Sequence, residues 1–479
     1  MTDQDLVYLS GEEVLKLFRS KELSPVEFMK AILEQAHKAH EAVNCATEFL
    51  EDRALKAAQI SEDRYMGKGE TPGSLEGLPL AVKEELPLAG THRSQACLAY
   101  KDRVDDFTVV YLQRLIDAGA IPHCKTTTPE FCLLGTTTSR QWGTSRNPWN
   151  RDMTTGGSSG GSGALLAAGG TTLATGTDIG GSIRIPAACC GVTGFKAPYG
   201  RNPEIAVFNL DYYSHTGPMA RTVNDLALMQ NVTSGQDLSD IASVREKIVL
   251  NTTRPVSLKG MKVAYSFDLE TGEIDDEVVA NFQQTLDFLA GEGVQLTEAK
   301  LGWPQNSCAL SELYLSHVWG RTLLREYEEH GDLLCDYTID YAKGAALSTS
   351  EDLIQANEAA YEMYLSLGPY LEANDVFLCP GMSVVGPEAH TAYETIPYTR
   401  NGKPAEMAAL SGFLTAQFNM LSRCPVLSLP SGFANNGMPL GVQAVAKPFY
   451  DERCVAFGRA YEAAVGGWYN ASDKRPVLA

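Results

Sequence analysis

The sequence predicts an α/β protein, because segments with strand character alternate with segments with helix character. The clearest case is a strand over 259–265, a helix over 275–291 and a second strand over 294–297. Such alternation is typical of a sheet covered by layers of helices. Hydrophobic residues form 44% of the 479-residue chain and charged residues 20%, so a large core can be buried. Length alone favours about three domains, although single large α/β domains exceed that prior.

The N-terminal part is expected to be a helical flank over residues 1–70. Two capping boxes mark helix starts within residues 10–66, and the second has a proline at the first helical position. The boxes are Ser10 with Glu13 and Ser24 with Glu27, and the proline is Pro25. A loop rich in Gly, Pro and Ser over 67–77 then leads to an apolar, strand-like run that ends at Lys83.

Helix and strand patterns continue to the C-terminal end. A buried helix is expected at 165–168, and the loop at 381–404, which carries Gly and Pro, is a candidate lid. The other helices are expected at 105–118, 353–371, 412–420 and 451–464, and the other strands at 120–125, 375–379, 425–429 and 441–446.

Two groups of side chains leave two interpretations open. The polar group either lines a pocket or forms turns. The aromatic group has roughly helical spacing, a pattern that is more often core than substrate pocket. The first group is Thr126, Thr127, Thr128 and Gln141, and the second is Tyr314, His317, Trp319 and Tyr327.

Charge and composition exclude several classes of partner. A net charge of −20, from 59 acidic and 39 basic residues, argues against nucleic acid and anionic membranes. No apolar run approaches the roughly 18 residues of a membrane helix, and no signal peptide is expected at the N-terminus. The eleven cysteines include no C-x-x-C pair, so neither a disulfide framework nor a zinc site is expected. Reduced cysteines are typical of a cytoplasmic protein, which is the expected location.

The stretch 156–187 holds two runs of small residues, GGSSGGSG and GTDIGGS. Glycine lets the main chain approach a ligand closely, so these runs predict amides that face a negative charge. A Walker loop is excluded because no lysine occurs between Arg151 and Lys196, and the dinucleotide fingerprint lacks its spacing. The remaining candidate is the oxyanion of acyl transfer. The backbone amides expected around it are those of Ile179, Gly180, Gly181 and Ser182.

A serine at the end of such a loop needs a base. None of the eight histidines lies in the stretch. A lysine can serve if it is buried and uncharged, because burial disfavours the charged form. The candidate is Lys83, at the end of its apolar run. In the nucleophile turn, Asp178 and Arg184 are expected to pair and hold the shape of the turn, with Thr177 hydrogen-bonded inside it.

The same stretch resembles the signature of the amidase signature family, which are serine hydrolases with a Ser–Ser–Lys triad. The family pattern is a glycine–serine run followed at a fixed distance by Asp-x-Gly-Gly-Ser-Ile-Arg-x-Pro. This chain fills the pattern with Asp178, Gly180, Gly181, Ser182, Ile183, Arg184 and Pro186. Segments 147–150, 194–201, 215–221, 427–432 and 437–443 also look like family segments.

By position, the resemblance makes Ser182 the nucleophile, Ser158 the bridging serine and Lys83 the base. The peptide bond before Ser158 is cis in family structures. The resemblance implies hydrolysis of an amide, ester or carbamate (urethane) through an acyl-enzyme, with no metal and no cofactor. The implied partner is a small-molecule substrate, and the expected assembly is a monomer or homodimer.

The resemblance also implies the architecture, a single domain over 1–479 with a mixed central β-sheet flanked by helices on both faces. Residues 75–225 would form the signature core, and 300–412 a variable insert that borders the substrate. One feature departs from the family, which often follows the lysine with Asp-Asn, because Glu84 and Glu85 stand there. A carboxylate facing Lys83 would favour the charged lysine, so both are expected to point away.

A second function stays open, a glutamine-hydrolysing component of a transamidating complex that frees ammonia for a partner. Such a component would carry the same triad. It also needs a cationic anchor for the substrate carboxylate, for which Arg201 and Arg321 are the available choices. A catalytically inactive binding protein is disfavoured because all three triad positions are filled.

Overall fold

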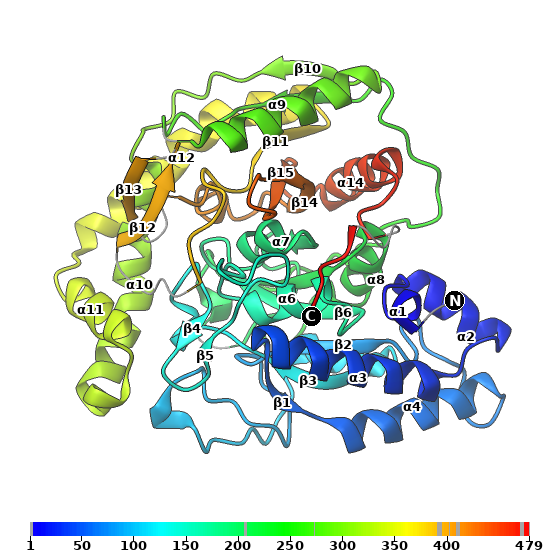
Figure 1. Ribbon diagram of the computed structural model, residues 1–479. Coiled ribbons are helices and arrows are strands. Elements are labelled where there is room, and N and C mark those ends of the chain that lie inside the picture. The colour runs from blue at the N-terminus through cyan, green and yellow to red at the C-terminus, as the bar shows by residue number, and fades with distance from the viewer. Residues whose placement is uncertain are drawn as a thin grey trace.

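A mixed β-sheet runs through the molecule and organises the helices around it (Figure 1). The structure is a computed structural model that describes residues 3–205, 208–272, 274–389, 395–401, 403–408, 412–469 and 474–478. Among these residues the main sheet has eleven strands. In spatial order they are β1 (Ala46–Phe49), β3 (Ile121–Thr126), β2 (Pro79–Lys83), β6 (Leu173–Asp178), β8 (His215–Ala220), β7 (Thr193–Lys196), β14 (Val426–Phe433), β15 (Pro439–Val445), β11 (Val376–Pro380), β9 (Lys262–Tyr265) and β10 (Gln295–Glu298).

The sheet is mixed because parallel pairs near its two ends flank an antiparallel middle. Strand β2 pairs in parallel with β3 and β6, and β9 pairs in parallel with β10 and β11. The strands between them, from β6 through β8, β7, β14 and β15 to β11, pair antiparallel. The prediction of a mixed central sheet in a single α/β domain is confirmed.

Strand β11 shows that helices cover both faces. Its side chains Val376 and Leu378 join a core with α9 (Asp276–Gly291) and α14 (Asp451–Val465). The alternating Phe377 and Cys379 join a core with α12 (Ser350–Ala373) and α13 (Gln417–Met420). Because successive strand residues point to opposite faces, a strand buried on both faces is apolar throughout.

The N-terminal flank differs from the sequence prediction at one strand. Both capping boxes form, and they begin two of the flank's four helices. The expected run of helix over 10–66 is interrupted by β1, which pairs antiparallel with β3 at the edge of the sheet. A short strand between two helices has too few residues to show a period, so tertiary pairing decides it. The helices are α1 (Asp3–Leu6), α2 (Gly11–Ser20), α3 (Pro25–Val43) and α4 (Glu51–Tyr65).

Two predicted helices have different bounds. The buried helix expected at 165–168 is α6 (Gly160–Ala167), which begins inside the first glycine run. The helix expected at 412–420 is only α13, because the residues from 412 to its start have no regular structure. The remaining α-helices are α5 (Val110–Asp117), α7 (Arg184–Cys190), α8 (Val223–Thr233), α10 (Ser307–His330) and α11 (Asp336–Ala345), with 3₁₀ turns at Leu98–Tyr100, Glu130–Cys132, Phe208–Leu210 and Gly331–Leu333.

The carboxyl ends of two neighbouring parallel strands place the key residues. Strand β2 ends at Lys83, and β6 ends at Asp178. The loop that precedes α6 and the loop between β6 and α7 both reach this edge. Ligands of α/β sheets commonly bind outside the carboxyl ends of the strands, where loops converge.

Helices α10, α11 and α12 form a layer along one side of the molecule (Figure 1). Two small ribbons, β4 (Thr138–Ser139) with β5 (Gly143–Thr144) and β12 (Thr395–Arg400) with β13 (Lys403–Ala408), lie outside the main sheet. The candidate lid at 381–404 falls partly outside the described residues, at 390–394 and 402.

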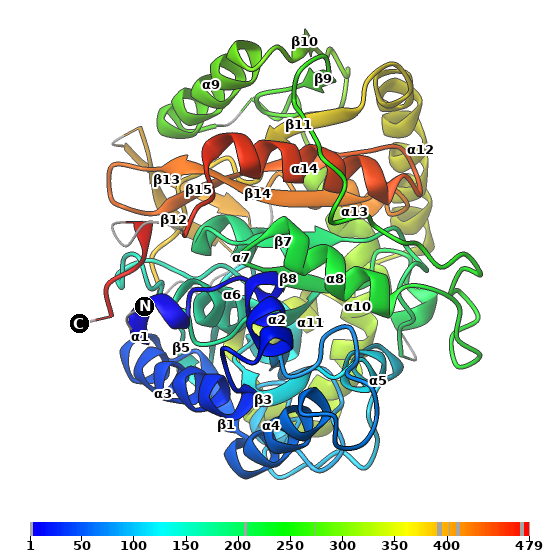
Figure 2. The same ribbon diagram turned by 90° about the vertical axis from the view of Figure 1, so that its right-hand side faces the viewer.

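The two ends of the chain lie side by side (Figure 2). Tyr8 stacks on Tyr469 with ring centroids 5.9 Å apart, and Arg475 pairs with Asp5 at 3.0 Å. In the part of the chain that is described, none of the helices has the length and apolar character to cross a bilayer.

Candidate active site

Lys83 is fully buried and its amine is held by two hydroxyl groups. Lys83 Nζ donates hydrogen bonds to Ser158 Oγ at 2.7 Å and to Thr177 Oγ1 at 2.6 Å. The backbone N–H of Lys83 donates to Thr175 Oγ1 at 2.9 Å, which ties β2 to β6 at this level. The structure therefore brings together Lys83, Ser158 and Thr177, which are far apart in sequence.

The loops of Ser158 and Ser182 lie against each other. The backbone N–H of Ser159 donates to the carbonyl oxygen of Ser182 at 3.1 Å. The Gly157–Ser158 peptide bond is cis, as the resemblance implies. Ser158 is fully buried, whereas Ser182 is 7% exposed and lines a cavity. Ser182 is thus the serine that an incoming molecule can reach.

The expectation that both glutamates point away from Lys83 is wrong for Glu85. Glu85 Oε2 lies 3.3 Å from Lys83 Nζ and accepts a hydrogen bond from Thr177 Oγ1 at 2.6 Å. Burial alone would raise the pKa of the Glu85 carboxyl. The charge of Lys83 and the hydrogen bonds from Thr177 and the Cys132 thiol outweigh burial and hold that pKa below its usual value. A carboxylate therefore stands beside the amine and favours its charged form.

Glu84 does point away from Lys83. Its carboxylate accepts hydrogen bonds from the backbone and hydroxyl of Ser94 and from the N–H of Gln95. Burial raises the pKa of the Glu84 carboxyl above its usual value, although Lys125 and these hydrogen bonds oppose the shift. Two adjacent glutamates thus have different roles, because successive residues after a strand face different directions.

Asp178 and Arg184 form a fully buried ion pair across the nucleophile turn. Arg184 Nη2 donates to Asp178 Oδ1 at 2.9 Å and Arg184 Nε to Asp178 Oδ2 at 3.0 Å. Burial would raise the pKa of Asp178, but Arg184 and the amide of Asn419 hold it well below its usual range. The other Arg184 donors reach Gln443 Oε1 at 2.8 Å and the Thr415 carbonyl at 2.9 Å. The expected pairing of Asp178 with Arg184 is present.

The same carboxylate takes one of the four amides expected to surround the oxyanion. The Gly181 N–H donates to Asp178 Oδ1 at 2.8 Å, because the carboxylate is a charged acceptor within the same turn. Among the described residues, the amides of Ile179, Gly180 and Ser182 have no such acceptor. Gly181 has φ +128°, and a Cβ there would lie 2.1 Å from Thr415 Oγ1, so only glycine fits.

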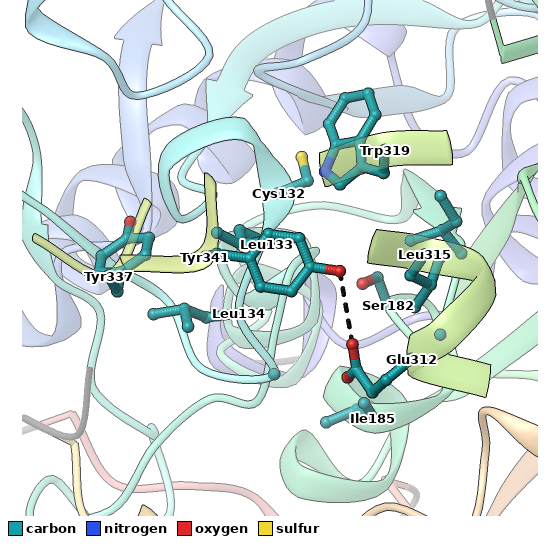
Figure 3. A pocket seen from close by; sticks show the side chains of 13 residues that line it. Cys132, Leu133, Leu134, Ser182, Ile185, Glu312, Leu315, Trp319, Tyr337 and Tyr341 are labelled. Atoms are coloured by element: carbon teal, nitrogen blue, oxygen red, sulfur yellow. Dashed lines mark hydrogen bonds between the residues drawn. The ribbon is translucent and has the colours of Figure 1, made fainter. Parts of the chain in front are cut away.

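A cavity of about 60 Å³ opens at Ser182 (Figure 3). One wall is residues 132–135, and a second is the nucleophile turn with Ile185. The third wall comes from α10 and α11, which contribute Glu312, Leu315, Trp319, Tyr337 and Tyr341. Apolar side chains dominate this lining, a composition typical of small-molecule sites.

The aromatic group at helical spacing divides between core and cavity. Trp319 lines the cavity. Tyr314 is buried, stacks on Tyr213 with centroids 3.8 Å apart and donates to Asp211 at 2.8 Å. The remaining two contact other parts of the fold: His317 bonds to Ser348, and Tyr327 packs in a cluster between α10 and α11.

The other residues considered from sequence lie away from the described cavity lining. The three threonines hydrogen-bond to neighbouring loops and helices, and Gln141 is not part of the lining. Arg201 is fully buried and pairs with Asp451 at 2.9 Å, and Arg321 donates to the Ser348 carbonyl. Neither arginine therefore supplies a cation to the cavity. Among the described residues there is also no cluster of three or more His, Cys, Asp or Glu side chains that could hold a metal ion.

A family model described as Amidase matches residues 27–455. The chain belongs to the amidase signature family. An acylamidase of Rhodococcus erythropolis is 31% identical over 486 residues, which span 100% of this chain and 99% of that protein. One of the subunits of the glutamyl-tRNA(Gln) amidotransferase of Neisseria meningitidis serogroup C (strain 053442) is 30% identical over 483 residues, which span 96% and 98%.

A solved structure with the same fold is a bacterial aryl acylamidase of the amidase signature family. It superposes with a TM-score of 0.88 at 25% identity and covers 95% of this chain and 96% of the other. Membership of the amidase signature family makes this protein an amidohydrolase that acts on a carbon–nitrogen bond. The family alone does not choose the substrate, since relatives with different named activities match over nearly the same length.

Sequence reasoning missed two sets of residues around the amidase site. The first supports the ion pair from the C-terminal part of the chain, and its one signal was that Gln443 closes a segment that looks like the family. The second is the α10–α11 wall, for which helical periodicity gives no sign of which face meets Ser182. The first set is Thr415, Asn419 and Gln443, and the second includes Glu312, Tyr337 and Tyr341.

Replacing Arg184 with Met should cost about 3–5 kcal/mol of unfolding free energy, because it leaves the Asp178 carboxylate buried without its partner. Urea denaturation followed by circular dichroism measures the loss. The matched control is Arg453→Met, which breaks an Arg–Asp pair of equal length, 2.9 Å, with side chains 37% and 41% exposed. That control should cost no more than about 1 kcal/mol. Equal losses in the two variants would contradict the structural role of the buried pair.

Proposed function

We propose that this amidase hydrolyses its substrate through an acyl-enzyme on Ser182, with Ser158 and Lys83 as a proton relay. The observation that carries the proposal is the 2.7 Å contact between Lys83 Nζ and Ser158 Oγ, next to the loop of a cavity-lining Ser182. A hydroxyl both donates and accepts, so Ser158 can receive a proton from Ser182 and pass one to Lys83. The acylamidase relative supports this reaction class.

In the first half-reaction, Ser182 Oγ bonds to the substrate carbonyl carbon while its proton moves to Ser158 Oγ. The Ser158 proton moves to the uncharged Lys83 Nζ. The C–N bond then breaks, and the amine leaves with a proton returned by the same route. Water attacks the acyl-enzyme in the second half-reaction, and the relay runs again to release the acid and free Ser182.

The oxyanion donors that we propose are the backbone amides of Ile179, Gly180 and Ser182. They belong to one turn whose shape is fixed by Asp178 and Arg184, so they are oriented before the substrate binds. Preorganised donors stabilise a charge that develops in the transition state without any cost of reorientation at that moment. Asp178, Arg184 and Thr177 support the site by position and do not exchange protons with the substrate.

We infer that the substrate is a small amide with an apolar portion, because apolar side chains dominate the cavity lining. An ester or a carbamate would follow the same steps with an alkoxide or a carbamoyl group in place of the amine or acyl part. The glutamine-hydrolysing alternative is less favoured. The described lining contains no lysine or arginine to bind the carboxylate of free glutamine, and both arginines considered for that role are engaged elsewhere.

Replacing Ser182 with Ala should remove nearly all hydrolysis of aryl amides, because the variant has no nucleophile. A fluorophosphonate probe followed by peptide mass spectrometry should label Ser182 in the parent protein and nothing in the variant. The control is Ser162→Ala, which removes a buried hydroxyl of α6 that bonds to the Thr175 carbonyl. The control should keep its labelling. A label on another serine would overturn the assignment.

Replacing Lys83 with Met keeps the length of the side chain but removes the base. The rate of acylation should fall by about 10²–10⁴-fold, as for loss of a general base. Single-turnover kinetics at neutral pH measures this step. Lys125→Met is the control, since Lys125 is also buried but lies on β3 and donates to the Leu86 carbonyl. Full activity of the Lys83 variant would rule out its role as the base.

Replacing Glu85 with Gln should move the rising, acidic limb of the pH–rate profile to lower pH. Without the carboxylate at 3.3 Å, the ammonium form of Lys83 loses a stabilising charge, so the uncharged base is present at lower pH. Profiles of kcat/KM measure the shift. Glu84→Gln is the matched control, because Glu84 faces Ser94 instead. If both variants shift the limb equally, the argument from proximity fails.

A further inference from the structure

Glu312 places a carboxylate in the wall of the cavity that contains Ser182. It lies in the first half of α10 and lines the same cavity as Ser182, Ile185 and Leu315. Figure 3 shows the Glu312 side chain entering the cavity next to Ser182. The proposed acyl transfer makes no use of this carboxylate, and helical spacing alone gave no indication of it.

The Glu312 carboxylate has little to compensate its charge. The Tyr341 hydroxyl donates to Glu312 Oε2 at 3.4 Å, which is long for a hydrogen bond. Among the described residues, none of the ion pairs includes Glu312. Burial in the cavity wall raises the pKa of the Glu312 carboxyl to about 7, although the Tyr341 hydroxyl acts against that shift. A half-buried carboxylate with one weak donor is a site for a further partner.

The other titratable groups that face Glu312 are neutral. They are the Tyr341 hydroxyl of α11 and the Cys308 thiol of α10. Burial raises the pKa of Tyr341 well above its usual value, and burial raises the pKa of Cys308 to about 12, so neither supplies a positive charge or competes as an anion near neutral pH. The missing positive charge therefore has to come from a molecule in the cavity.

We propose that Glu312 is a specificity-determining residue that binds a positively charged amine, so that the preferred substrates are amides bearing a primary ammonium group. This inference rests on the proposed hydrolysis at Ser182. The neighbours Leu315, Ile185 and Leu134 suit a methylene chain, and the carboxylate suits the charged end of that chain. A substrate carboxylate, by contrast, would meet a like charge and no cation in the described lining.

A purely structural role for Glu312 is the competing explanation. The Tyr341–Glu312 hydrogen bond links α11 to α10, but these helices also pack through Leu323 and Ala342. Tyr341→Phe removes the hydrogen bond and keeps the carboxylate. If Glu312 serves the packing of the two helices, this variant should behave as Glu312→Gln does. If Glu312 serves the substrate, the two variants should differ in substrate preference.

The test uses pairs of p-nitroanilides with acyl chains of equal length, one ending in an ammonium group and the other in a methyl group. A second set carries the same ends on the amine side of an acetamide, so that either side of the scissile bond is covered. Within a pair, the ratio of kcat/KM cancels the pH dependence of the shared catalytic relay. In the parent protein the ratio should favour the ammonium member for at least one chain length.

Glu312→Gln should lower this ratio by about 10- to 100-fold, the range for a hydrogen bond to a charged group. In the parent protein, the ratio should increase as pH rises through about 7, because the carboxyl with raised pKa is charged only above that value. Tyr341→Phe should keep the preference. Glu328→Gln removes the same charge from an exposed site on α10 and should also keep it.

Calorimetric titration with alkylammonium ions and with alcohols of equal length gives a second measurement that needs no turnover. Parent protein should bind the ammonium ions more tightly, and Glu312→Gln should lose that difference. An unchanged ratio and unchanged binding in Glu312→Gln would overturn the inference even if the amides are hydrolysed. Hydrolysis of no member of either set, with no fluorophosphonate label, would instead overturn the proposed function, and calorimetry would still decide the role of Glu312.

Discussion

The buried ion pair between Asp178 and Arg184 is the interaction on which the rest of the site depends. Asp178 ends β6 and Arg184 begins α7, so the pair closes both sides of the turn that carries Ser182. The carboxylate takes two amides from inside the turn, and the guanidinium reaches Gln443 and Asn419 in the C-terminal part of the chain. A buried ion pair is tolerated only when its remaining donors and acceptors are satisfied. The shape of the turn therefore depends on residues that lie far away in sequence, 235 positions from Arg184 in the case of Asn419.

The sequence predicted those parts of the site that local chain geometry determines. Lys83 was found because an apolar strand that ends in a charged residue must hold that residue at the sheet edge. The small-residue runs indicated amides that approach a ligand closely. Glu85 was missed because alternation fails after a strand ends, and the direction of a side chain then depends on the turn. The cavity wall from α10 and α11 was also missed, since helical periodicity shows which face is apolar but not which other element it meets.

The fold was predictable for the same reason and failed in the same way. The strand–helix alternation around β9, α9 and β10 is strong, and each of these elements lies within a few residues of its expected bounds. Strand β1 has four residues and exists because the edge of β3 offers it backbone partners. Helix α13 is short because the chain before it turns to bring Thr415 and Asn419 to the ion pair. In both cases tertiary contacts overrule local propensity.

The carboxylate beside Lys83 has two opposing effects on the proposed relay. Before the reaction, Glu85 favours the ammonium form and so lowers the fraction of protein with an uncharged base. During acylation, Lys83 becomes positively charged, and the same carboxylate stabilises the charge that forms. A base that holds its proton more strongly accepts it more readily in the transition state. The Thr177 hydroxyl moderates both effects, because it donates to Glu85 and accepts from Lys83 at the same time. The balance between the fraction of active base and its strength is therefore set by one hydroxyl placed between two charges.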